Sequence, residues 1–107
     1  APLPVAPLVL PPPTALELIW AAAARHGVRG ARLEQLARCE SSLNPQAVGP
    51  GGYAMGLFQW TWPSWREVAP QAGYGDASPF DAEAASMVAA WAIRHGQGWR
   101  WRACGQY

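Results

Sequence analysis

Charged residues are scarce in this chain, and lysine is absent. The 107 residues carry 8 cationic side chains, all of them arginine, against 7 acidic ones, so the net charge is only +1. Proteins that bind nucleic acid display a basic patch, which so balanced a composition does not indicate. Hydrophobic residues make up 50% of the chain, so its composition is not that of a disordered protein. The length suits one domain with one core.

Metal-binding and membrane-spanning patterns are also missing. The two cysteines, Cys39 and Cys104, form no C-x-x-C pair and no Cys/His cluster, so we expect no zinc site. His26 and His95 each precede a glycine at an expected helix end, where a cation is favoured. No run approaches the roughly 20 apolar residues that span a membrane. No signal peptide is visible at the start, so a secreted form would require a signal that has been removed.

The chain divides into two parts. Residues 1–13, APLPVAPLVLPPP, are rich in proline and favour an extended polyproline II conformation. We interpret them as an arm or linker. Residues 14–107 then form the folded domain.

Helical patterns dominate that domain. Thr14 and Glu17 form a capping box, and apolar residues recur at helical spacing up to a stop at Gly27. Trp20 belongs to this stripe and is expected in the core. A second helix is expected over 31–41.

The later part of the chain is expected to contain two further helices. One covers 63–69, with Ser64 and Glu67 as another capping box, and the other covers 81–95. Gly and Pro turn signals fill 44–60, which leaves room for at most a short hairpin around 53–59. The predicted fold class is mainly α with a loop-rich middle.

The two cysteines are candidates for a disulfide. A Cys39–Cys104 bond would close a loop of about 65 residues, which contributes roughly 4 kcal/mol on the chain-entropy model. Such a bond implies an oxidising compartment. The alternative is two free thiols.

Tryptophan is unusually common, with 7 residues. Trp60, Trp62, Trp99 and Trp101 lie outside clear helical stripes. A flat apolar ring with one N–H donor suits the faces of sugar rings. The alternative role for each ring is to fill the core.

Glu40 stands at the end of the apolar stripe of the second helix, where a buried carboxylate is costly unless it is paired or protonated. The negative end of the helix dipole also disfavours its charge. Cleavage of a glycosidic bond needs an acid that donates a proton to the leaving oxygen, and burial raises the pKa of such an acid. Glu40 is therefore the candidate catalytic residue.

Two motifs, CESSLNP at 39–45 and GLFQWTWPSW at 56–65, resemble the lytic transglycosylase family, of the soluble-lytic type in the lysozyme-like superfamily. Glu40-Ser41 with Asn44-Pro45 match the first family motif, and 56–59 match the second. The cysteine before Glu40 and the ending W-x-x-C are similar to resuscitation-promoting factors, which supports the Cys39–Cys104 disulfide. Larger members carry a later Ala-Tyr-Asn motif that has no match in 81–107.

The resemblance implies a small lysozyme-like fold and a reaction on peptidoglycan. Glu40 would act alone as acid and then as base, and would leave a 1,6-anhydro product at the MurNAc-GlcNAc β-1,4 bond. Candidate substrate-binding residues are Ser41, Tyr53, Gln59 and Trp62. Ser41 has the alternative of ending the helix, and Gln59 of stabilising a turn.

Two other functions remain open. A lysozyme-type hydrolase would need a second carboxylate, for which the candidates are Glu67, Asp76, Asp81 and Glu83, although Glu67 and Asp81 already suit helix starts. A non-catalytic peptidoglycan-binding module would use the aromatic side chains alone. We expect a monomer that is secreted, periplasmic, associated with the cell wall or delivered by a phage. We expect no cofactor and no nucleic-acid partner.

Overall fold

The computed structural model describes residues 2–104 and is mainly helical. Its elements are α1 (Ala15–His26), α2 (Gly30–Ser41), the 3-10 turn η1 (Pro50–Gly52), α3 (Trp62–Val68), α4 (Ala82–Arg94) and the 3-10 turn η2 (Gly98–Trp101). Within the described residues, β structure is limited to isolated antiparallel bridges that Met55 forms with Val48 and with Trp60. The structure confirms the predicted small, mainly α fold with a loop-rich middle.

Local capping sets the start and end of α1. The Glu17 backbone N–H donates to Thr14 Oγ1 at 3.1 Å, and the Thr14 N–H donates to Glu17 Oε1 at 3.1 Å. This reciprocal pair confirms the predicted capping box. Gly27 ends the helix with a φ of 68°, a left-handed conformation that glycine adopts at little cost.

The prediction that Trp20 lies in the core is wrong. Its side chain is 47% exposed and lies against the start of α2, where a Cβ on Gly30 would overlap the indole ring. The indole N–H donates to Glu34 Oε1 at 2.8 Å. Trp20 therefore covers the contact between α1 and α2 from outside, because Gly30 allows the ring to approach the helix so closely.

The predicted capping box of α3 is also wrong, although the helix begins within one residue of its expected start. Thr61, not Ser64, is the N-cap, and its hydroxyl accepts from the Ser64 backbone N–H at 3.4 Å. Pro63 fits the first turn, where its missing N–H has no partner to lose. Glu67 therefore has no capping role. It lies later in the helix and forms an ion pair with Arg100, with 3.5 Å between Oε1 and Nη2.

The core forms around α4. Asp81 caps this helix by accepting from the Ala84 N–H at 2.9 Å, as predicted for its helix-start role. The buried face of α4 consists mainly of alanines, whose small side chains let α1 approach closely. Larger side chains complete the core, including Ile19, Leu33, Leu57, Phe58, Trp60, Trp65, Val68, Val88 and Trp101.

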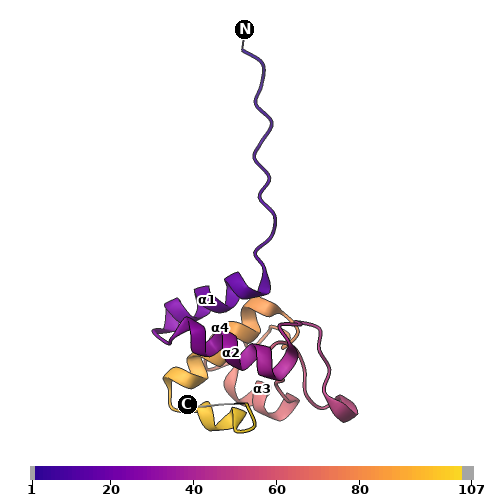
Figure 1. Cartoon of the computed structure of the whole chain (residues 1–107), viewed down its shortest axis with the longest axis vertical. Helices are drawn as coiled ribbons and strands as arrows, with labels where there is room; N and C mark the ends of the chain where they lie inside the picture. Colours follow the sequence, from indigo (N-terminus) through magenta and orange to yellow (C-terminus); the bar gives the residue numbers. More distant parts are fainter. Residues whose placement is uncertain (1, 105–107) are drawn as a thin grey trace.

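The proline-rich segment extends away from the domain as an arm (Figure 1). Its large apolar side chains are 73–93% exposed, namely Leu3, Val5, Leu8, Val9 and Leu10. In the described part of the chain, no helix has the length and apolar character needed to cross a membrane.

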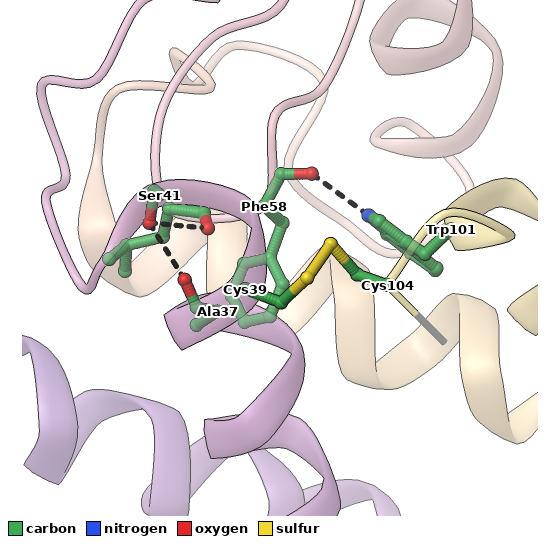
Figure 2. The surroundings of a disulfide bond; sticks show 7 residues. Ala37, Cys39, Ser41, Phe58, Trp101 and Cys104 are labelled. Carbon is green, nitrogen blue, oxygen red and sulfur yellow. Dashed lines mark hydrogen bonds between the residues drawn. A yellow bond between two sulfur atoms is a disulfide. The ribbon is translucent and has the colours of Figure 1, made fainter. Parts of the chain in front are cut away.

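The disulfide prediction is confirmed. Cys39 and Cys104 are bonded, with 5.7 Å between their Cα atoms. The bond joins the last turn of α2 to the segment after η2, and Figure 2 shows both cysteines between these two elements. Residues 105–107, the end of the predicted domain, lie outside the described residues.

Candidate active site around Glu40

Glu40 lies in the last turn of α2, directly after the disulfide-bonded Cys39. Its side chain is half-buried. Among residues 2–104, no side chain or backbone group forms a hydrogen bond or ion pair with its carboxyl group. Burial raises the pKa of Glu40 above its ordinary value. A carboxyl group in this setting holds its proton to higher pH than an exposed one and is free to donate it.

Ser41 connects the Glu40 end of α2 to the turn at 56–59. Its hydroxyl lies 3.0 Å from the Ala37 carbonyl and 2.8 Å from the Leu57 carbonyl, and it can donate its one hydrogen to either. Both acceptors are backbone carbonyls, and Figure 2 shows the Ala37 carbonyl beside the Ser41 hydroxyl. The hydroxyl therefore fixes the distance between the helix end and the turn.

The turn at 56–59 is tightly built. Met55 and Trp60 exchange two backbone hydrogen bonds, of 2.9 and 3.0 Å, which close the turn. Gly56 has a φ of 79° and passes so close to the Pro79 carbonyl that a Cβ would overlap it. Both features require glycine at this position. The side chains of Leu57 and Phe58 are fully buried and anchor the turn in the core.

Gln59 stabilises this turn with its side-chain amide. Its Nε2 donates to the Gly56 carbonyl at 2.9 Å and to the Ala47 carbonyl at 3.2 Å. Its own φ is 52°, a conformation that few residues other than glycine adopt. Because both amide hydrogens are engaged, only the amide oxygen is left to accept a further hydrogen bond.

Tyr53 and Trp62 are exposed residues on either side of this turn in the sequence. Tyr53 follows η1 and is 77% exposed. Trp62 is the first residue of α3 and is 47% exposed, with the Arg66 guanidinium 5.4 Å from its ring centroid. In the part of the chain that the structure describes, no hydrogen bond, ion pair or ring contact joins either of them to Glu40. The ring of Tyr53, and the face of Trp62 that is turned away from Arg66, are therefore candidates to contact a ligand.

The other tryptophans divide between core and surface. Trp60 and Trp101 are 2% and 4% exposed and pack edge to face at 5.1 Å, so they fill the core. Trp99 is 50% exposed, and the Arg100 guanidinium lies 4.6 Å from its ring centroid. Of the four rings outside helical stripes, Trp62 and Trp99 can present a face to a sugar.

The candidate second carboxylates have structural roles or lie at the surface. Asp81 caps α4, and Glu67 pairs with Arg100. Asp76 and Glu83 are exposed. Among the described residues there is no group of three or more His, Cys, Asp or Glu that could hold a metal ion.

Sequence reasoning did not find the contribution of Trp101. Its indole N–H donates to the Phe58 carbonyl at 2.8 Å, within the turn that carries Gln59 (Figure 2). The two residues are 43 positions apart. The W-x-x-C spacing before Cys104 is the only sequence signal that singles out this tryptophan, and it indicates nothing of its partner.

Comparison with known families assigns the chain to a class. The transglycosylase SLT domain family matches residues 17–99, which include Glu40 and the 56–59 turn. The chain therefore belongs to this family, and membership supports a peptidoglycan lytic transglycosylase activity in general. Searches of curated proteins and of solved structures gave no match.

Ser41→Ala is expected to lower the free energy of unfolding by about 1 kcal/mol, because the Leu57 carbonyl loses a partly buried donor. Thermal or urea unfolding of the purified variant measures this change. Ser42→Ala is a suitable control, because Ser42 is exposed and its backbone N–H, not its side chain, bonds to Arg38. Equal stabilities for the Ser41 variant and the parent would contradict the inferred connection between α2 and the turn.

Proposed function

We propose that this protein is a lytic transglycosylase that cleaves the MurNAc-GlcNAc β-1,4 bond of peptidoglycan, with Glu40 as its single acid/base. The observation that carries the proposal is the half-buried Glu40 carboxyl, with a raised pKa and no bonding partner among residues 2–104. The Glu40-Ser41 pair resembles the Glu-Ser of the first family motif and lies within the matched segment, which supports the proposal.

The mechanism needs one carboxyl group in two protonation states. Protonated Glu40 donates its proton to the glycosidic oxygen as the bond to the sugar breaks. The substrate's own N-acetyl group stabilises the cationic centre that forms. The Glu40 carboxylate then takes the proton from the sugar's 6-hydroxyl as that oxygen closes the 1,6-anhydro ring. The proton lost in the first step is recovered in the second, and the nucleophile is already held next to the centre.

The roles of the other carboxylates favour this route over hydrolysis. An inverting or retaining hydrolase uses a second carboxylate across the bond from the acid. Asp81 and Glu67 are engaged in a helix cap and an ion pair. Transglycosylation requires neither. A pure binding module, the other alternative, has no use for a carboxyl group whose pKa is raised and which lacks a partner.

The exposed aromatic side chains are proposed to hold the glycan strand. Trp62 and Tyr53 present flat faces that suit the C–H faces of sugar rings. The Gln59 amide oxygen can accept a hydrogen bond from the substrate, while Ser41 acts through the turn it supports. The expected partner is therefore the peptidoglycan strand itself, bound by a monomer.

Trp62→Ala is expected to raise KM about five- to tenfold with little change in kcat, because a stacking face is lost without disturbing Glu40. Steady-state kinetics on solubilised glycan strands measure both constants. Trp20→Ala is the matched control, since Trp20 is equally exposed at 47% but lies on α1. A KM that rises equally in both variants would remove Trp62 from the binding surface.

The disulfide and the family indicate a location outside the cytoplasm. We propose that the protein is secreted, periplasmic or associated with the cell wall, or delivered to the wall by a phage. In each of these places its substrate is directly accessible.

Product analysis tests the proposed function. Purified peptidoglycan is digested with the protein, and the soluble muropeptides are analysed by mass spectrometry. Products lighter by one water molecule than hydrolysed muropeptides are expected. Reducing-end products would instead show a lysozyme-type hydrolase and renew the search for a second carboxylate. Binding to the glycan without any product would support the binding module.

A further inference from the structure

The segment after α4 contacts all three parts of the chain that carry the candidate site. Residues 98–104, which we call the C-terminal clamp, comprise η2 and the turn that ends at Cys104. Three of its residues bond to three different elements. These elements are α2, the 56–59 turn and α3.

Each bond of the clamp is specific. Cys104 is covalently joined to Cys39, the residue before Glu40. Trp101 donates its indole N–H to the Phe58 carbonyl at 2.8 Å, next to Gln59. The Arg100 guanidinium lies 3.5 Å from both Ser64 Oγ and Glu67 Oε1 on α3.

Trp101 is the most deeply buried of these three anchors. Its side chain is 4% exposed and packs edge to face against Phe58 at 6.4 Å and Trp60 at 5.1 Å. Among residues 2–104, its N–H forms the clamp's one hydrogen bond to the 56–59 turn. The neighbouring carbonyl, that of Leu57, is held from the other side by Ser41. Successive carbonyls of the turn are thus fixed by α2 and by the clamp.

We propose that Trp101 is a positioning residue. Through its bond to the Phe58 carbonyl, it holds the 56–59 turn at a fixed position relative to the Glu40 end of α2. This inference rests on the proposed function, because it assigns Trp101 a part in that reaction. Trp101 is buried and does not touch the substrate. It acts on the distance between the proton donor and the turn, and misplacement by about 1 Å costs about 100-fold in rate for oriented reactions.

The test is Trp101→Phe, which keeps an aromatic ring but removes the N–H donor. At a temperature where the variant is fully folded, kcat is expected to fall about ten- to a hundredfold, with KM changed by less than about threefold. Ser41, the neighbour of Glu40, is bonded to the Leu57 carbonyl of the same turn, so we expect displacement of the turn to loosen this end of α2 and to reduce the burial that raises the Glu40 pKa. The alkaline limb of the pH–rate profile is therefore expected to shift to lower pH. Loss of stability alone would not move that limb.

Trp65→Phe is the matched control. Trp65 is also buried, at 2% exposed, and donates its indole N–H to a backbone carbonyl, that of Ala77, at 3.0 Å. Trp65 itself lies on α3 and packs edge to face against Trp60 at 5.6 Å, but the carbonyl that it bonds lies outside the three elements, so loss of its N–H frees no bond to the 56–59 turn. The control is expected to lose a similar amount of stability and to keep its kcat and pH profile. Equal kinetic losses in both variants would overturn the proposal.

A second measurement separates this inference from the proposed function. Titration of the Glu40 side-chain carboxyl by NMR, in the parent and in Trp101→Phe, needs no substrate. A lower pKa in the variant, with shifted amide signals at 56–59, supports the positioning role even if the parent has no activity. An unchanged titration and unchanged amide signals overturn it even if the parent is active. If Trp101→Phe does not fold, replacement of Trp101 by benzothienylalanine, in which sulfur takes the place of the indole N–H, removes the same donor from the Phe58 carbonyl while keeping the shape of the ring, and is expected to shift the same signals in the same direction.

Discussion

Glu40→Gln is expected to abolish turnover of peptidoglycan, with a loss of about a thousandfold or more. Glutamine keeps the shape and the hydrogen-bonding atoms of a protonated glutamic acid but has no acidic proton to give and no carboxylate to act as base. Because one residue performs both steps in the proposed mechanism, neither step survives. The measurement is the rate of release of soluble muropeptides. Glu83→Gln, the same change at an exposed position on α4, is the control and is expected to keep full activity.

The same substitution is expected to stabilise the fold at neutral pH. The folded-state pKa of Glu40 is raised, so the unfolded chain loses this proton first as the pH increases. Glu40 therefore costs stability as the pH rises from its unfolded pKa, about 4.3, through its higher folded pKa, and the cost remains above that. Glutamine does not titrate and carries no such cost. The unfolding curves of the parent and of Glu40→Gln are expected to differ at a pH above the folded-state pKa of Glu40 and to coincide at a pH below its unfolded pKa.

An active Glu40→Gln variant would contradict the mechanism. A variant that is inactive but less stable at neutral pH would contradict the inferred environment of Glu40, because a stabilising partner for its charge would then have been lost. The two results address the chemistry and the electrostatics of the site separately. In the parent, activity is expected to fall as the pH rises through the raised pKa of Glu40, since the acid step needs the proton.

The parts of the fold that were predicted correctly depend on contacts between near neighbours. The Thr14–Glu17 box and the Asp81 cap span three residues each, and such bonds leave a visible pattern in the sequence. Gly27 likewise ends α1 through its own conformation. The sequence also indicates the unusual setting of Glu40, because both the apolar stripe that it ends and the dipole of the helix belong to a single helix.

The errors arise where a distant residue determines the role. Ser64 and Glu67 match the pattern of a capping box, but Thr61 takes the cap, and Arg100, more than thirty positions later, contacts both side chains. The helical spacing of Trp20 among apolar residues predicts a position in the core, whereas the small Gly30 on the next helix lets the indole ring lie outside. Nothing in the sequence reports which distant group an arginine or an indole N–H will reach.

The second large effect is expected from loss of the disulfide. Replacing both Cys39 and Cys104 by serine opens the loop that the disulfide closes across a sequence separation of 65, so the unfolded chain gains conformational entropy. The chain-entropy model gives a resulting loss of about 4 kcal/mol in the free energy of unfolding. A small domain has only about 5–15 kcal/mol of total stability, so this loss is a large fraction of it. Denaturant unfolding of the double variant measures it, and reduction of the parent protein is expected to give the same change.

The disulfide variant also separates stability from positioning. Trp101 still has its hydrogen bond to Phe58, and Arg100 still reaches α3, so two anchors of the C-terminal clamp remain when the covalent one is removed. Below its melting temperature the double variant is therefore expected to keep a larger share of kcat than Trp101→Phe, although it loses more stability. The reverse order, with the disulfide variant slower than Trp101→Phe while fully folded, would show that the covalent bond beside Glu40 positions the site and that the indole bond is secondary.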